Sequence, residues 1–215
     1  MLGESSVASR FEVTAAGGLT PIVGREEEIA LLANRWRLAK DGEGQVVILS
    51  GEAGVGKSRI VEGFRQSLEG EEFGTVMLSC ARFRTGSALY PVIECLGRVT
   101  GFEAGDSALV KADKLEDFIR ALDLDPAQIV PHLWTYIFEA GDARYPAPEG
   151  NPEELRHQTL QCLLSMLFAQ SSRRPMMMIA EDVHWVDPST LEFLGLMVDH
   201  LRDRRVMLLI TARPE

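Results

Sequence analysis

The residues of this chain that are best suited to chemistry form one short stretch, GEAGVGKS, whose spacing matches G-x-x-x-x-G-K-[ST]. Phosphate oxygens need several backbone N–H groups that converge on one point, and glycines permit the tight loop that this requires. Lys57 supplies a cation for the terminal phosphates, and the Ser58 hydroxyl is a ligand for Mg²⁺. We therefore predict a phosphate-binding loop for a nucleoside triphosphate, formed by Gly51, Glu52, Ala53, Gly54, Val55, Gly56, Lys57, Ser58 and Arg59.

Two adjacent carboxylates, Glu181 and Asp182, follow the apolar run MMMIA. A phosphoryl-transfer site needs carboxylates that hold Mg²⁺ and orient an attacking water. We predict that Glu181 supports the metal and that Asp182 positions the water, although the sequence leaves the two roles interchangeable. The alternative is an acidic pair that merely ends a strand in solvent.

Polar residues near the end of the chain form a third candidate group. Thr211 and Arg213 follow the apolar run VMLLI, where a hydroxyl and a cation would sense the γ-phosphate. The alternative for Arg213 is an ordinary surface arginine. Asp187 is sufficiently explained as a helix cap, and a direct catalytic part for it is the less favoured interpretation. His184 is interpreted as a packing or hydrogen-bonding residue rather than a ligand.

These candidates lie at the ends of predicted strands. The β-branched run at 45–50 leads into the phosphate-binding loop, and its continuous apolar character predicts a strand buried on both faces of a parallel sheet. A helix is predicted at 57–68 and a second strand at 74–80. This order is a βαβ unit with a right-handed crossover. Because parallel strands present their carboxyl ends at one edge, the candidate residues should meet there.

The remaining pattern predicts a strand-poor middle and two further strands. Strands are predicted at 176–181 and 206–211, and none between 81 and 175. Helices are predicted at 26–40, 91–99, 114–122, 128–138, 153–170 and 188–201. The stretch 141–154 is predicted to be an exposed loop, and 1–20 a linker or upstream remnant. The fold class is therefore α/β, a three-layer P-loop arrangement with a mainly parallel sheet, flanking helices and a helical insertion, over residues 21–215.

Composition excludes several classes of function. A net charge of −10 disfavours nucleic acid as a partner, because affinity for phosphate backbones comes from clustered Lys and Arg. Cys80, Cys95 and Cys162 are far apart and lack metal-ligand spacing, so we interpret them as reduced thiols of a cytoplasmic protein. The sequence has neither a basic-then-apolar leader nor an apolar run long enough to span a bilayer, so a soluble protein with no membrane partner is expected.

Four segments together resemble a known family. PIVGREEE, GEAGVGKS, MMMIAEDVHWVD and LLITARPE, in that order, are similar to the signal-transduction ATPases with numerous domains, a branch close to the AAA+ ATPases. The resemblance covers about residues 19–215. The residues of these segments look most like those of the ATPase module that accompanies class III adenylate or guanylate cyclase domains in bacterial multidomain proteins.

The resemblance implies roles that the residues alone do not give. Val23, Gly24 and Arg25 would lie against the adenine and ribose of ATP or ADP, and Arg213 would be the γ-phosphate sensor. The family commonly has Asp at the metal-supporting position, so Glu181 puts efficient hydrolysis in question. The family continues into another strand, a helical lid and a winged-helix region. We therefore expect a truncated core in which the strand at 45–50 forms an open edge, and the strand at 206–211 lies between it and that at 176–181.

Three functions stay open at this stage. The first is a slowly hydrolysing ATP switch that controls an attached output domain, such as a nucleotidyl cyclase, or a protein partner. The second is a nucleotide-binding module without turnover. A P-loop small-molecule kinase is less favoured, because no acceptor site or arginine-bearing lid can be identified. A GTPase is disfavoured because no N-K-x-D sequence occurs.

Overall fold

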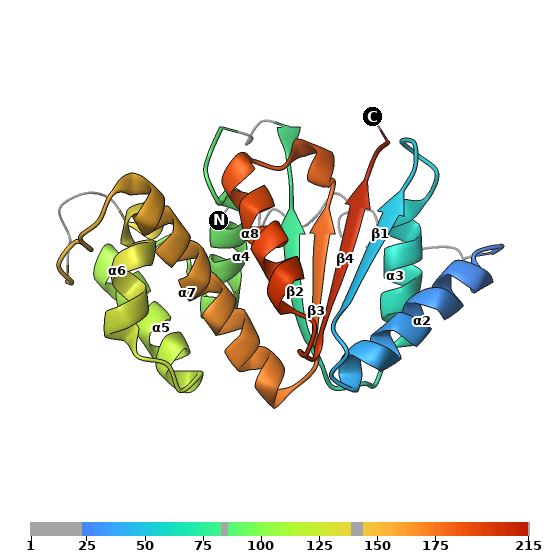
Figure 1. The fold of residues 1–215 in the computed structure, drawn as a ribbon, viewed down its shortest axis with the longest axis horizontal. Coiled ribbons are helices and arrows are strands. Elements are labelled where there is room, and N and C mark those ends of the chain that lie inside the picture. Colours follow the sequence, from blue (N-terminus) through green and yellow to red (C-terminus); the bar gives the residue numbers. More distant parts are fainter. Residues whose placement is uncertain (1–22, 83–85, 139–143, 215) are drawn as a thin grey trace.

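The computed structural model describes residues 23–82, 86–138 and 144–214. Its centre is a parallel sheet in the order β1-β4-β3-β2 (Figure 1). The strands are β1 (Gln45–Ser50), β2 (Gly74–Ser79), β3 (Met176–Glu181) and β4 (Val206–Ala212). The predicted open edge is confirmed, because β1 pairs only with β4 within the described chain.

Helices cover both faces of this sheet and extend beyond it on one side (Figure 1). They are α2 (Glu26–Lys40), α3 (Lys57–Ser67), α4 (Tyr90–Thr100), α5 (Ala108–Ala121), α6 (Pro126–Ile137), α7 (Pro152–Arg173) and α8 (Pro188–His200), with a short 3₁₀ helix, η2 (Val183–Trp185). The α/β class, the flanking helices and the helical insertion are therefore confirmed.

Side-chain alternation in the central strands divides the core into two clusters. Met177 and Ile179 of β3 pack with α2 and α3, whereas Met176 and Met178 pack with the helices α4 to α8. Successive side chains of a strand point to opposite faces, so a strand buried on both faces is apolar at every position. The strands β3 and β4 are thereby fixed between the two layers.

The expectation that the strand at 45–50 is buried on both faces is wrong. Val46 and Ile48 are 37% and 60% exposed, while Val47 and Leu49 pack against the cluster of α2 and α3. Ile48 is in register with Ile210 of β4, on the face that α4 to α8 cover. Among the described residues, that cluster includes no side chain from β1. The helices therefore stop short of the edge strand.

One glycine fixes the amino end of β1 against the rest of the molecule. The Gly44 N–H donates to the Arg202 carbonyl at 2.9 Å, just before β4. A Cβ at Gly44 would lie 1.8 Å from the backbone oxygen of Leu201, so no side chain fits. The absence of a side chain is thus required for close approach of two backbones.

The predicted elements correspond closely to those of the structure. The predictions at 26–40, 45–50 and 176–181 have the bounds of α2, β1 and β3. The largest boundary difference is at α5, which begins at Ala108, six residues before the predicted 114, because Ser107 caps it through the Val110 N–H. The predicted linker at 1–20 and the first part of the predicted loop, 141–143, lie outside the described residues.

Candidate nucleotide-binding site

The phosphate-binding loop connects β1 to α3, as the sequence predicts. Gly54 and Gly56 have φ of 84° and 93°, a left-handed backbone that side chains other than glycine adopt at a cost. Gly56 is the residue before α3 and no side chain caps that helix. The N–H groups at the start of α3, with the positive end of the helix dipole, are thus available to an anion.

Lys57 and Arg25 reach this loop from two sides. The Lys57 ammonium donates to the carbonyls of Gly51 at 2.6 Å and Glu52 at 3.0 Å. Arg25 Nη2 donates to the Val55 carbonyl at 3.1 Å, and its Nη1 lies 2.6 Å from Glu28 Oε1. The hydrogen bond from Arg25 is the main cause that lowers the pKa of Glu28. The segment before α2 is therefore fastened to the phosphate-binding loop.

The other two residues expected near the adenine differ in their surroundings. The Gly24 N–H donates to Glu26 Oε1 at 3.1 Å, which orders the entry to α2. Val23 is 83% exposed. Arg25 thus meets the phosphate-binding loop directly, and contact of these residues with adenine stays a prediction.

The two carboxylates follow β3 in unlike backbone conformations. Glu181 is the last residue of β3 and is half-buried. Asp182 has φ of 55° and is 52% exposed, and its backbone N–H donates to the Thr211 hydroxyl oxygen at 3.0 Å. Positive φ in a residue other than glycine is uncommon and is kept only where the surroundings enforce it. Thr211 of β4 supplies that restraint and is itself 2% exposed.

Arg213 follows β4 directly and is exposed. The Gly51 N–H lies 3.4 Å from the Ala212 carbonyl, so the first residue of the phosphate-binding loop adjoins the end of β4. Because β4 lies between β1 and β3, Lys57, Asp182 and Arg213 all belong to the carboxyl edge of adjacent strands. The fold brings the predicted groups to one edge of the sheet.

Asp187 is the helix cap that the sequence predicts. It also makes a contact that the sequence does not predict. Its carboxylate accepts from the Thr190 N–H at 2.9 Å and from the Thr190 hydroxyl at 2.5 Å. It also accepts from the Leu89 N–H at 3.0 Å, across 98 residues of sequence. Asp187 is 2% exposed, so it joins the start of α8 to the start of α4 rather than facing a ligand.

Negative charge gathers around the end of β2. Burial raises the pKa of the Cys80 thiol to about 12, and the carboxylates of Asp187, Asp182 and Glu181 add to this effect. Burial likewise raises the pKa of Cys162 to about 11. The thiols Cys80, Cys95 and Cys162 are free, as expected from their spacing, and their raised pKa values favour the unreactive protonated form.

One cation in this region was missed by the sequence analysis. The guanidinium of Arg82, just after β2, lies 5.2 Å from the centroid of the Trp185 ring in η2. Such a separation is in the range of cation–π attraction. Nothing in the local sequence pairs residues 82 and 185. Their contact depends on the adjacency of β2 and β3.

The donor set fits Mg²⁺ held with a nucleotide rather than by protein alone. Among the described residues, no three His, Cys, Asp or Glu side chains gather in a group that could hold a metal ion. Mg²⁺ usually keeps several waters and takes one or two carboxylates together with substrate phosphates. A hydroxyl at Ser58 and carboxylates at Glu181 and Asp182 are donors of this kind.

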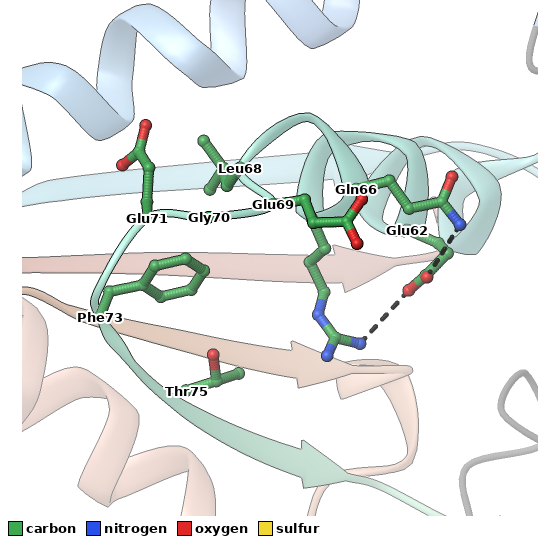
Figure 2. Close-up of a pocket in the computed structure, with 9 residues that line it drawn as sticks. Glu62, Gln66, Leu68, Glu69, Gly70, Glu71, Phe73 and Thr75 are labelled. Carbon is green, nitrogen blue, oxygen red and sulfur yellow. Dashed lines mark hydrogen bonds and ion pairs between the residues drawn. The ribbon is translucent and has the colours of Figure 1, made fainter.

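A hollow of the described surface lies away from these residues (Figure 2). Its volume is about 610 Å³, and it is lined by Glu62, Arg65, Gln66, Leu68, Glu69, Gly70, Glu71, Phe73 and Thr75. Arg65 and Gln66 both bond to Glu62 there. Its carboxylates would repel a phosphate, so this hollow is not part of the nucleotide site. The hydrogen bond from Lys40 is the main cause that lowers the pKa of Glu71 on its rim.

Comparisons with known proteins agree with this geometry. A family model described as AAA ATPase domain matches residues 21–210. An uncharacterized protein of Rhizobium meliloti is 29% identical over 213 residues, which are 99% of this chain and 20% of that protein. The AAA+ ATPase ClpV1 of Pseudomonas aeruginosa is 41% identical over 68 residues, 29% of this chain and 7% of that protein. The chain thus spans a fifth or less of the length of these relatives.

Within its described residues, none of the helices has the length and apolar character needed to cross a membrane.

Proposed function

Because the chain belongs to the AAA ATPase domain family, we propose that it binds ATP or ADP with Mg²⁺ and hydrolyses ATP slowly. The observation that carries this proposal is the position of the loop Gly51–Ser58. It opens α3 beside the end of β4, on the edge where β3 delivers Glu181 and Asp182.

The protein groups have separate tasks in this proposal. The loop N–H groups and Lys57 hold the β- and γ-phosphates, and Arg213 contacts the γ-phosphate. Asp182 orients the attacking water, and Thr211 holds the backbone of Asp182 in place. Val23, Gly24 and Arg25 lie against the adenine and ribose.

Ser58 and Glu181 would hold the magnesium ion, with the roles of Glu181 and Asp182 exchangeable. When bound, this ion neutralises charge that develops on the phosphate oxygens. Glu181 and Asp182 are consecutive, but β3 ends between them and Asp182 turns to a positive φ. The two carboxylates therefore stand on unlike backbone conformations, which supports a division of labour.

We further propose that hydrolysis serves as a switch in a longer cytoplasmic protein. The matched relative from Rhizobium meliloti is several times longer than this chain, which leaves room for an output domain. A nucleotidyl cyclase is the output that the sequence resemblance favours, and a lid and winged-helix region after residue 215 would complete the ATPase core. Nucleic acid and membrane are not among the proposed partners.

A binding module without turnover is the second candidate, and Glu181 is the observation that favours it. A Glu side chain is one methylene longer than the Asp common in the resembled family, so its carboxylate reaches a different place. In that case nucleotide would bind and stay intact.

The test combines calorimetry with a phosphate-release assay on one sample. ATP, ADP and GTP are titrated with Mg²⁺, and release is then measured. We expect adenine nucleotides to bind and phosphate to be released. Binding without release favours the second candidate, and no binding at all overturns both.

Two variants locate the chemistry. Lys57→Ala should weaken ATP binding, because it removes the cation of the phosphate-binding loop. Asp182→Asn should preserve binding and lower turnover by about 10²- to 10⁴-fold, as expected for loss of a group that handles the attacking water. Equal turnover in the wild type and Asp182→Asn would eliminate the hydrolytic proposal.

A further inference from the structure

His184 lies two residues after Asp182, in the 3₁₀ helix η2. Both ring nitrogens are buried, and neither has a hydrogen-bond partner among the described residues. The side chain as a whole is 16% exposed. A buried polar atom without a partner is rare in folded proteins and calls for a physical reason.

The cost of this arrangement is appreciable. An unsatisfied buried donor or acceptor destabilises the fold, because burial removes its hydrogen bonds to water. An aromatic hydrocarbon ring would occupy the same space without that cost. A side chain kept only for packing therefore needs no nitrogen at this position.

A carboxylate lies just beyond hydrogen-bonding distance of His184. Nδ1 is 4.0 Å from Asp182 Oδ1, whereas a hydrogen bond between these atoms spans about 2.7–3.2 Å. The Asp182 side chain is half exposed and can rotate, while its backbone N–H is held by Thr211. A small rotation of the carboxylate would therefore close the gap without moving the strand.

The imidazole itself is held from its other side. Its ring lies 4.9 Å from the Trp185 ring at an interplanar angle of 48°, and Arg82 lies over that Trp185 ring. The 3₁₀ turn that carries His184 is closed by the Trp185 N–H, which donates to the Asp182 carbonyl at 2.8 Å. The imidazole thus packs against Trp185 beside a half-exposed carboxylate.

We propose that His184 is a positioning residue for Asp182: in the nucleotide-bound state its Nδ1–H donates to the Asp182 carboxylate and fixes that group on the attacking water. This inference rests on the proposed hydrolytic function and deepens it. The hydrogen bond that the carboxylate accepts leaves its second oxygen for the water. No proton leaves the imidazole in this role.

Three substitutions at residue 184 test which atom matters. His184→Phe keeps an aromatic ring and removes both nitrogens. His184→Asn places an amide N–H close to the position of Nδ1, and His184→Gln places one close to Nε2. We expect kcat for ATP to fall about 10- to 100-fold in His184→Phe, the range found when an orienting partner is lost. His184→Asn should recover most of it and His184→Gln little, with the Kd for ATP unchanged throughout.

A matched control and a second background separate positioning from packing. His157 is an exposed histidine of α7, and His157→Phe should leave turnover unchanged. In the Asp182→Asn background, His184→Phe should have no further effect, because two residues that act as a unit are not additive. The melting temperature of His184→Phe should equal or exceed that of the wild type. A fall in both the melting temperature and ATP binding would indicate a packing role and overturn the proposal.

A spectroscopic measurement decides the matter without turnover. The imidazole ¹⁵N signals of His184 are assigned by their loss in His184→Asn and then followed as Mg²⁺ and a non-hydrolysable ATP analogue are added. A shift of Nδ1 that is absent in Asp182→Ala supports the proposal, and no shift overturns it. Calorimetric binding with hydrolysis and no shift overturns this inference alone. A shift without hydrolysis would preserve the contact between His184 and Asp182 but overturn the hydrolytic function and, with it, the positioning role; absence of binding overturns both.

Discussion

The hydroxyl of Thr211 accepts a hydrogen bond from the backbone N–H of Asp182 at 3.0 Å, and this bond joins the ends of β4 and β3 at the candidate site. Thr211 was predicted as a γ-phosphate sensor on the strength of its place in the sequence. In the structure its hydroxyl oxygen also accepts a hydrogen bond from within the protein. The residue after β3 adopts its left-handed backbone beside a fixed acceptor.

Thr211→Val is expected to lower turnover while nucleotide affinity stays within about threefold. Valine has a similar shape but no hydrogen-bond acceptor, so the Asp182 N–H loses its partner. The backbone that carries the Asp182 carboxylate is then no longer held in place. A lost hydrogen bond of about 1.4 kcal/mol corresponds to a tenfold fall in kcat. Steady-state phosphate release measures this. Thr211→Ser keeps the oxygen and should behave as wild type; an equal defect in both variants would count against the assignment.

Asp187→Ala should destabilise the fold by about 2–4 kcal/mol. It removes a helix cap, and it leaves the buried Leu89 N–H without its acceptor. Urea denaturation gives the free energy of unfolding. Asp125→Ala is the matched control, since Asp125 caps α6 through the Ala127 N–H on the surface, and its loss should cost only about 1 kcal/mol. Equal losses would show that the contact with Leu89 adds nothing.

Arg25→Ala should raise the Kd for ATP about three- to tenfold. Arg25 holds the carbonyl of Val55, so its removal leaves the phosphate-binding loop to be ordered at the expense of binding energy. Calorimetry measures the change. Arg37→Ala removes a similarly exposed arginine of α2, paired with Asp41 at 3.2 Å, and should have no effect on nucleotide affinity. An unchanged Kd in Arg25→Ala would refute the loop-ordering role.

The free energy of unfolding is expected to fall at alkaline pH because of the Cys80 thiol. Burial raises its pKa from 9.0 to about 12 in the folded chain, so the unfolded chain loses its proton first. The stabilising effect is complete below pH 9 and is lost as the pH rises from about 9 to 12. Cys80→Ala should therefore show a shallower decline in the free energy of unfolding across this window than the wild type. Parallel declines would contradict the raised pKa.

Ile48→Lys should reduce self-association at high protein concentration. Ile48 is 60% exposed on an edge strand, and uncovered apolar edges promote pairing between chains. Sedimentation velocity over a concentration series measures the effect. Leu109→Lys, at a residue of α5 that is 57% exposed, removes a comparable apolar side chain away from the sheet edge. If Leu109→Lys reduces association as much, general hydrophobicity rather than the edge is responsible.

The sequence predicts this fold well where the signal is local. The bounds of β1 and β3, the phosphate-binding loop and the Asp187 cap all follow from apolar runs, glycine spacing and helix-start residues. The error at β1 has a different origin. The apolar run at 46–49 is the same in sequence whether or not a helix covers its second face, and the residue type of Ile48 does not indicate its exposure.

Contacts across long stretches of chain were beyond prediction for the same reason. The adjacency of the strands that carry Asp182 and Thr211 was expected, but the bond between these residues was not. The bond from Leu89 to Asp187 and the approach of Arg82 to Trp185 depend on the pairing of β2 with β3, which the sequence does not specify. The nitrogens of His184, which lack a hydrogen-bond partner among the described residues, are a further case, since burial of a particular atom has no signature in residue type. The candidate site was thus predictable as a set of residues and unpredictable as a set of contacts.

The close approach at Gly44 has a consequence for how this domain tolerates genetic variation. Every side chain at this position would collide with the backbone of Leu201, so a saturation library should be depleted at residue 44 as strongly as within the phosphate-binding loop. A selection experiment alone would therefore group Gly44 with the glycines proposed to bind phosphate, although it lies at the opposite end of β1. A screen that scores abundance separately from activity would distinguish the two, because losses at Gly44 would reduce the amount of protein, whereas Lys57 variants would accumulate as folded, inactive protein.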